Sequence, residues 1–147
     1  KSCKIEFKPL FLYEVTKYFN LNSLKTIMKQ ILLVDDKATI GKVLTMYLGK
    51  EYELVYQENA LKAIDWLSQG NEPSLIISDI RMPGMTGAEF LEYLKNNALW
   101  KHIPVIMLSS EESTSERIRL LEVGAEDYIL KPFNPMELKA RVKKYLQ

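Results

Sequence analysis

The sequence predicts a doubly wound α/β fold, with one five-stranded parallel sheet covered by helices on both faces. From residue 30 onward, short apolar segments alternate five times with segments whose apolar residues recur at helical spacing. Runs such as PVIML (104–108) are apolar throughout, which is typical of strands buried on both sides. The chain has 147 residues, 47% of them hydrophobic, enough for one domain with its own core. The alternation implies right-handed crossovers, and we expect the five-stranded order 2-1-3-4-5 that is common among doubly wound sheets.

The five expected strands are short apolar segments separated by polar residues and turn signals. The first, QILLV, is typical of a strand buried in the middle of a sheet. In chain order the expected strands cover residues 30–34, 53–56, 75–78, 103–108 and 128–130.

The five expected helices carry apolar residues three and four positions apart, and several have recognisable ends. Asn59 is a plausible N-cap, Gly70 and Gly124 are stop signals, and Pro135 stands in a first helical turn. In chain order the expected helices cover residues 39–48, 60–67, 87–96, 114–123 and 135–146.

The composition excludes several classes of protein. One cysteine, Cys3, and one histidine, His102, provide neither a disulfide framework nor a Cys/His zinc site. The formal net charge is +1, and residues 28–147 alone hold 15 basic and 17 acidic residues, which argues against nucleic-acid binding by this part. No apolar run is long enough to span a bilayer. We therefore expect a cytoplasmic protein that does not associate with membranes.

Polar side chains stand at the carboxyl ends of four of the five expected strands. Asp35-Asp36 follow the first strand, Asp79 the third, Ser109-Ser110 the fourth and Lys131-Pro132 the fifth. Ligands bind at this edge of open parallel sheets, where strands one and three are neighbours. Three carboxylates so close together require a positive charge, and oxygen ligands without His or Cys suit Mg²⁺. With a lysine and a hydroxyl nearby, the pattern predicts a phosphoryl-transfer site with an aspartate nucleophile.

Each of these residues also has an ordinary structural interpretation. Asp35-Asp36 could cap the first helix, and Asp79 could be a turn residue before Met82-Pro83-Gly84. Ser109-Ser110 could be an N-cap, and Lys131 a solvated loop residue. We favour the functional interpretation because the ordinary one requires four independent coincidences at the strand ends of one fold.

Four motifs resemble the receiver domain of two-component response regulators, in their order as well as in their separations. They are ILLVDD (31–36), SDIRMPGMTG (78–87), VIMLSS (105–110) and GAEDYILKPF (124–133). The resemblance covers residues 29–147 and implies a flavodoxin-like (βα)5 fold. Residues 1–28 are then an N-terminal extension.

The resemblance implies a role for each residue of the site. Asp79 is the phospho-acceptor, and Asp35, Asp36 and the backbone carbonyl of Arg81 bind Mg²⁺ together with it. Lys131 contacts the phosphoryl oxygens, and its bond to Pro132 is expected to be cis, as in the family.

Ser109 and Tyr128 are the switch pair that the resemblance implies. The hydroxyl of Ser109 moves toward the phosphoryl group, and the ring of Tyr128 turns inward behind it. Many family members have Thr where Ser109 stands, so we expect weaker coupling with the chemistry preserved. A plain core aromatic is the alternative for Tyr128. We also hypothesise that Arg81 and Glu111, which flank the acceptor, tune the access of water to the aspartyl phosphate.

The resemblance also implies partners. A sensor histidine kinase or a phosphotransfer protein would be the phosphodonor, meeting the first helix and the strand-end loops. Residues 115–147 look most like receivers with winged-helix DNA-binding output, which dimerise through helix four, strand five and helix five by cross-chain ion pairs. A solvated charged face is the alternative. The matching residues here are Arg117, Glu122, Asp127, Glu137 and Arg141.

A signalling switch is expected, which phosphorylates and dephosphorylates only itself and is not a dedicated enzyme. Phosphatases and phosphotransferases with an aspartyl-phosphate intermediate usually carry a second aspartate two residues after the nucleophile, where this chain has Arg81. Flavin or nucleotide binders of the same fold need a glycine-rich loop after strand one, where Asp35-Asp36-Lys37 would repel a phosphate. Both observations argue against these classes.

Met28 could be a natural start, and the 27 residues before it then allow two origins, a native extension or a remnant of expression. Residues 9–20 place five apolar side chains on one helical face, so we predict a short helix docked on the receiver or on a neighbouring copy. At the other end, a stand-alone regulator and a receiver excised from a longer protein both fit.

Overall fold

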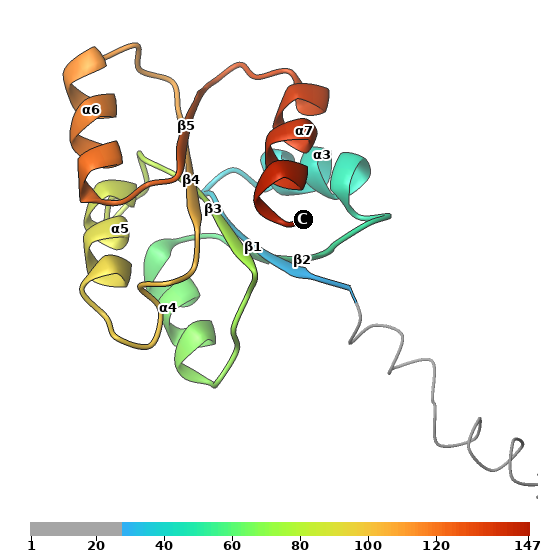
Figure 1. The fold of residues 1–147 in the computed structure, drawn as a ribbon, viewed down its shortest axis with the longest axis horizontal. Coiled ribbons are helices and arrows are strands. Elements are labelled where there is room, and N and C mark those ends of the chain that lie inside the picture. The colour runs from blue at the N-terminus through green and yellow to red at the C-terminus, as the bar shows by residue number, and fades with distance from the viewer. Residues whose placement is uncertain (1–27) are drawn as a thin grey trace, which may run out of the picture.

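The computed structural model describes residues 28–147. These residues form one wholly parallel five-stranded sheet in the order β2-β1-β3-β4-β5 (Figure 1), which confirms the predicted order. The strands are β1 (Gln30–Val34), β2 (Glu53–Gln57), β3 (Leu75–Asp79), β4 (Val105–Ser109) and β5 (Asp127–Leu130).

Helices cover both faces of the sheet, as predicted. Figure 1 shows α3 and α7 on one face and α4, α5 and α6 on the other. The five helices are α3 (Ala38–Leu48), α4 (Ala60–Ser68), α5 (Gly87–Lys95), α6 (Thr114–Val123) and α7 (Pro135–Tyr145).

The alternation of side chains along each strand builds two cores, one on each face. In β1, Ile31 and Leu33 pack into the core beneath α3 and α7, whereas Leu32 and Val34 pack into the core beneath α4, α5 and α6. All four are at most 1% exposed. Each such side chain contributes about 1.5–3 kcal/mol on burial, so the two cores hold the strand ends in fixed relative positions.

The helix ends follow the predicted signals. Asn59 accepts a hydrogen bond from the Lys62 N–H at 2.8 Å, and Pro135 opens α7. Gly124 ends α6 with a φ of 128°, a conformation open to glycine without strain.

Two of the ordinary interpretations are wrong. The N-cap position of α3 is Lys37, with no side-chain cap, so Asp35-Asp36 do not cap the helix. The N-cap of α6 is Ser113, whose hydroxyl accepts a hydrogen bond from Glu116 N–H. Ser109-Ser110 therefore do not start that helix.

Two of the strands that end in polar residues, β3 and β4, extend one residue further than predicted, whereas β1 and β5 end where predicted. Asp79 is the last residue of β3, in register with Leu108, and Ser109 is the last residue of β4. The ladder continues because the Ile80 N–H donates to the Leu108 carbonyl at 3.2 Å. The expected strand at 103–108 instead begins at Val105.

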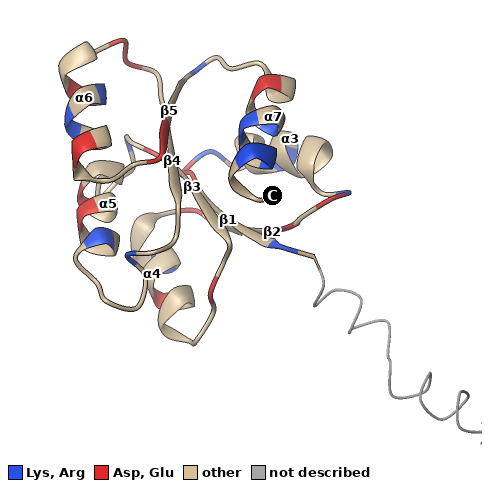
Figure 2. Cartoon of the chain, in the orientation of Figure 1, with Lys and Arg blue, Asp and Glu red and all other residues tan. Residues whose placement is uncertain are grey.

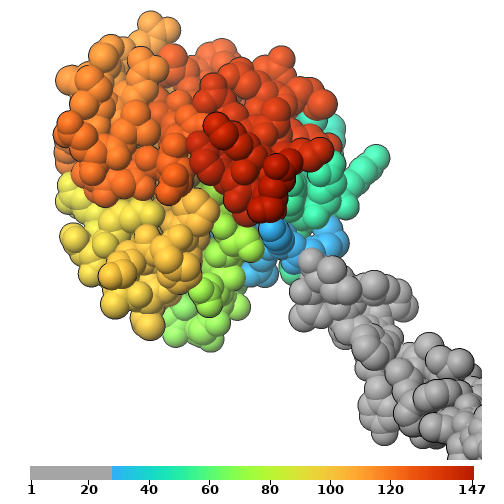
Figure 3. All heavy atoms as spheres, in the orientation of Figure 1, coloured from blue at the N-terminus to red at the C-terminus, as the bar shows by residue number. Residues whose placement is uncertain are grey.

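Residues 1–27 lie outside the described part of the chain, and so does the helix expected at 9–20. Lys29 Nζ donates a hydrogen bond to the Leu146 carbonyl, and Figure 3 shows the end of the chain next to the start of β1. Among residues 28–147, the structure contains no helix with the length and hydrophobicity required to cross a membrane.

Candidate functional site

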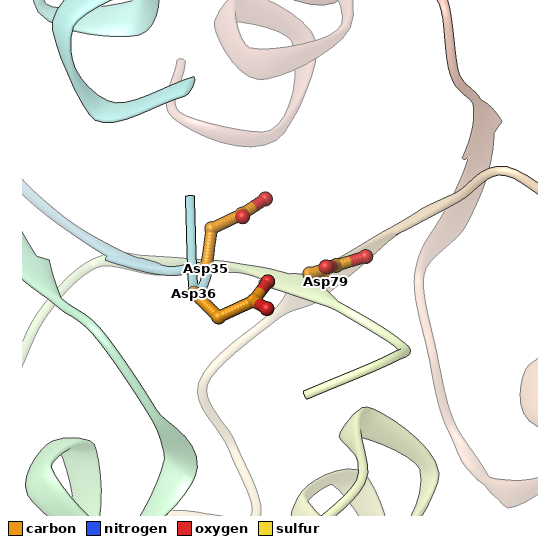
Figure 4. A group of neighbouring side chains, drawn as sticks. All are labelled: Asp35, Asp36 and Asp79. Carbon is orange, nitrogen blue, oxygen red and sulfur yellow. The ribbon is translucent and has the colours of Figure 1, made fainter. Parts of the chain in front are cut away.

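Three carboxylates converge where β1 and β3 end. Ligand oxygens of Asp35, Asp36 and Asp79 all lie within 4.8 Å of one another, and Figure 4 shows the three side chains around one space. Asp35 is fully buried, Asp79 is 6% exposed, and Asp36 is exposed at the mouth. The neighbouring positions of β1 and β3 in the sheet bring together residues that are 43 and 44 positions apart in the chain.

Lys131 supplies the positive charge that these carboxylates require. Its Nζ lies 2.8 Å from Asp35 Oδ2 and 3.3 Å from Asp79 Oδ1. It reaches them from the end of β5, where its backbone N–H donates to the Ser109 carbonyl at 2.6 Å. The Lys131–Pro132 peptide bond is cis, as predicted.

Burial raises the pKa of the Asp79 carboxyl above its ordinary value. Lys131 opposes this effect and Asp35 adds to it, so the pKa remains raised. The Ile80 N–H also stabilises the ionised form, because it donates to Asp79 Oδ1 at 2.9 Å. One lysine for three converging carboxylates leaves the site with an excess of negative charge.

Gly87 allows the next helix to begin directly against the end of β3. A Cβ at this position would lie 2.1 Å from the Asp79 carbonyl oxygen and 2.7 Å from Ile80 Cα. Because Gly87 has no side chain, its backbone can approach β3 closely, and its N–H donates to the Ile80 carbonyl at 2.7 Å. Thr86 then caps α5 in a reciprocal capping box with Glu89, which fixes the start of the helix.

Ser109 and Tyr128 are both attached to the backbone of Glu111. The Glu111 N–H donates to Ser109 Oγ at 3.0 Å, and the Tyr128 hydroxyl donates to the Glu111 carbonyl at 3.0 Å. Within residues 28–147, no hydrogen bond joins Ser109 to Asp79. The ring of Tyr128 is turned inward and only 7% exposed, in the core beneath α4, α5 and α6. Its position fits both a core aromatic and an inward switch residue.

Arg81, two residues after Asp79, forms an ion pair with Glu111. The pair joins the loop after β3 to the loop after β4 and borders a cleft of about 580 Å³, which is also lined by Ile80 and Thr86. The side chain of Arg81 is largely exposed, and that of Glu111 is about one third exposed. Most of the residues that line the cleft are charged or polar, and Ile80 and Arg81 in its wall directly follow Asp79 in the chain.

The charged residues predicted for a dimer face lie on α6, β5 and α7 (Figure 2). Arg141 pairs within its own chain, at 2.8 Å from both Asp127 Oδ2 and Glu137 Oε1. Arg117 lies 6.0 Å from the centroid of the Tyr128 ring, and Glu122 is exposed on α6.

Tyr56 was missed by the sequence patterns. Its hydroxyl donates to the Asp35 carbonyl at 2.6 Å, a contact that joins residues 21 positions apart and depends on the folded sheet. Glu111 was named from the sequence for water access only, whereas its backbone also contacts both Ser109 and Tyr128.

The donor set fits a hard divalent cation. All three converging side chains offer carboxylate oxygens, and the excess negative charge favours a cation beside Lys131. Asp35, Asp36 and Asp79 would hold the cation, and Mg²⁺ is the ion that such sites combine with phosphate chemistry.

Comparisons with known proteins agree with this arrangement. A sequence model of the response regulator receiver domain matches residues 31–143. The phosphate regulon transcriptional regulatory protein PhoB of Escherichia coli is 38% identical over 116 residues, 78% of this chain and 50% of that protein. Histidine kinase P4 of Formosa agariphila is 39% identical over 117 residues, 80% of this chain and 8% of that protein.

Solved structures lead to the same fold. The chemotaxis response regulator CheY4 of Vibrio cholerae superposes with a TM-score of 0.73 at 31% identity, covering 80% of this chain and 98% of that one. This chain spans about half the length of the PhoB relatives that it matches. Relatives named as transcriptional regulators support the subfamily likeness drawn from residues 115–147.

Proposed function

The chain belongs to the response regulator receiver domain family, and from that membership we propose that it acts as a phosphorylation-dependent signalling switch. Asp79 accepts a phosphoryl group in a Mg²⁺-dependent reaction. The observation that carries this proposal is the convergence of Asp35, Asp36 and Asp79 beside Lys131 at one edge of the sheet.

The chemistry is an in-line transfer to an ionised carboxylate. An oxygen of Asp79 attacks the phosphorus, and a new O–P bond forms while the bond to the donor atom breaks and leaves its electron pair on the donor. The Ile80 N–H orients the carboxylate through Oδ1. Lys131 Nζ lies 3.3 Å from Asp79 Oδ1, close enough to contact the phosphoryl oxygens after transfer and to stabilise their negative charge. A bound Mg²⁺ supplies further charge neutralisation between the carboxylates and the phosphoryl group.

The switch operates through the loop after β4. An aspartyl phosphate adds acceptor oxygens, and we propose that the Ser109 hydroxyl turns toward them and releases the Glu111 N–H. The carbonyl of Glu111 accepts a hydrogen bond from the Tyr128 hydroxyl. A shift of the Glu111 backbone would therefore move the Tyr128 ring and, with it, α6.

The phosphodonor that we propose is a sensor histidine kinase or a phosphotransfer protein, which would meet α3 and the strand-end loops. A related receiver segment within a histidine kinase supports this class of partner. We further propose a cytoplasmic location, no direct nucleic-acid contact by this domain, and no activity on substrates other than its own aspartyl phosphate. The slight acidity of residues 28–147 supports the absence of nucleic-acid contact.

A homodimer through α6, β5 and α7 is the assembly that we propose for the phosphorylated form. The charged residues along this face support it. Arg141 is already paired with Asp127 and Glu137, so dimerisation would share or exchange these pairs between chains.

The central test is incubation with acetyl phosphate and Mg²⁺, followed by intact-mass measurement. We expect one added phosphoryl group on the native protein, one on Asp65→Ala and none on Asp79→Ala. Asp65 is a matched control because it is an exposed aspartate on α4. Phosphorylation that persists in Asp79→Ala would contradict the assignment of the acceptor.

A further inference from the structure

Tyr56 connects three parts of the molecule around the acidic site. It lies in β2, the edge strand of the sheet, and its hydroxyl donates to the Asp35 carbonyl at 2.6 Å. Its ring lies against α3, since a Cβ added to Gly41 would be 3.1 Å from Tyr56 Cδ2. The side chain therefore bridges β2, the turn that carries two of the three carboxylates, and the first turns of α3.

The hydrogen bond falls on the peptide unit that sets the direction of Asp36. The Asp35 carbonyl belongs to the planar peptide that joins Asp35 to Asp36, so its orientation determines where the next residue points. On the other side of Asp35, its N–H donates to the Gln57 carbonyl at 3.2 Å. β2 thus holds Asp35 by its N–H and by its carbonyl.

Asp36 depends on this backbone more than Asp35 does. The Asp35 carboxylate accepts hydrogen bonds at 2.8 Å from both the Lys37 N–H and Lys131 Nζ. The carboxylate of Asp36 is exposed and makes no hydrogen bond or ion pair within residues 28–147. Its position opposite Asp79 in Figure 4 is therefore set by the backbone.

We propose that Tyr56 is a positioning residue for divalent-cation binding, whose hydroxyl holds the Asp35–Asp36 peptide so that the Asp36 carboxylate faces Asp79. This inference rests on the proposed function, in which these carboxylates bind Mg²⁺. Tyr56 contacts neither the cation nor the phosphoryl group. Loss of the Tyr56 hydroxyl therefore weakens the affinity for the cation, whereas the rate of phosphoryl transfer at saturating cation is unchanged.

Tyr56→Phe isolates the hydroxyl, because the ring and its packing on Gly41 remain. Tyr145→Phe is the matched control: the Tyr145 hydroxyl also donates to a backbone carbonyl, that of Glu126, at 3.1 Å and at the far end of the domain from the three carboxylates. Both variants lose one hydroxyl and its hydrogen bond to a backbone carbonyl. The Tyr145 hydroxyl also lies 3.4 Å from Asp127 Oδ2, but neither of its partners belongs to the three carboxylates.

The affinity is measured without any phosphodonor, from the rise in the unfolding midpoint as Mg²⁺ is added. We expect the half-saturating Mg²⁺ concentration to increase about three- to tenfold in Tyr56→Phe and to stay at the native value in Tyr145→Phe. In a second measurement, the maximal rate of phosphorylation by acetyl phosphate at saturating Mg²⁺ should match the native rate.

The outcomes separate this inference from the proposed function. An unchanged half-saturating concentration in Tyr56→Phe, with normal Mg²⁺ binding by the native protein, overturns the positioning role alone. An equal weakening in Tyr145→Phe, or a reduced maximal rate in Tyr56→Phe, also overturns it. If Mg²⁺ does not shift the midpoint of the native protein, the proposed cation site is wrong and the role of Tyr56 falls with it.

Discussion

At the scale of the single residue, the placement of the Asp79 carboxyl affects the stability of the folded chain. Asp79 is nearly buried among like charges, and the raised pKa of its carboxyl means that the folded chain holds the proton more tightly than the unfolded chain does. The stability from this proton is present below the ordinary pKa of 3.8 and is lost as the pH rises through the folded value. At neutral pH and without a cation, the ionised carboxylate therefore costs stability.

We accordingly expect Asp79→Asn to be more stable than the native protein at pH 7 in the presence of a chelator, by about 1 kcal/mol. The amide removes the buried charge with little change in shape. The difference should shrink as the pH falls through the raised pKa of the folded Asp79 carboxyl and should vanish below its ordinary value of 3.8. Urea unfolding at several pH values checks this.

Asp65→Asn is the control, because Asp65 is exposed on α4 and should show no such pH-dependent difference. Equal stability of Asp79→Asn and the native protein at every pH would contradict the expectation.

Elements meet at the site through close backbone contacts, and Gly87 is the tightest of these. A Cβ there would overlap the backbone of Asp79 and Ile80, which no side-chain rotation can relieve. The start of α5 can therefore lie against the end of β3 only if this position lacks a side chain.

We expect Gly87→Ala to lower the free energy of unfolding by about 3 kcal/mol and to slow phosphorylation of Asp79. Gly70→Ala is the control, because Gly70 has a φ of 92° but no atom within 4 Å of the added Cβ. That variant should lose only about 1 kcal/mol, from backbone strain. Urea unfolding compares the two, and equal losses would show that the contact with β3 is unimportant.

The loops after β3 and β4 are joined by the Arg81–Glu111 pair. We expect Arg81→Ala to shorten the half-life of the aspartyl phosphate, by up to about fivefold, because an exposed ion pair contributes at most about 1 kcal/mol. Intact-mass measurement after removal of acetyl phosphate follows the decay.

Lys139→Ala serves as the control, since it breaks another pair between elements, with Glu51 at 2.9 Å, and neither residue lines the cleft beside Arg81. A half-life that is unchanged in Arg81→Ala would refute a role for the pair in water access.

At the scale of the whole molecule, the proposed dimer depends on charged side chains, among them Arg141 and Glu137, that form ion pairs within a single chain. Glu137 lies 2.8 Å from Arg141, so Glu137→Lys places two cations together on the face formed by α6, β5 and α7. We expect this change to weaken self-association of the phosphorylated form at least about fivefold, which is about 1 kcal/mol. Sedimentation equilibrium measures it.

Glu72→Lys is the control, since Glu72 is an exposed glutamate that pairs with His102, away from α6 and α7. Phosphorylated Glu137→Lys that self-associates like the native protein would exclude dimerisation through this face.

The sequence was sufficient to predict the fold and the four polar strand ends. Strands that are apolar on both faces can be buried only in a parallel sheet covered by helices on both sides, and the chain order then places the strand ends at one edge. Asp35, Asp36, Asp79 and Lys131 were predicted for this reason. The limits of β3 and β4 were one residue short, because backbone pairing continues through Asp79 and Ser109.

Only the tertiary structure decided which side chains support that site. The hydrogen bond from Tyr56 to the Asp35 carbonyl joins residues 21 positions apart, and the bond from Tyr128 to the Glu111 carbonyl joins residues 17 positions apart. The pairing of Arg141 on α7 with Asp127 on β5, 14 residues away, was likewise absent from the sequence patterns. Hydrophobic periodicity depends on local spacing and survives in the sequence, whereas these contacts depend on strand register and side-chain rotamers, which are set only when the two cores pack.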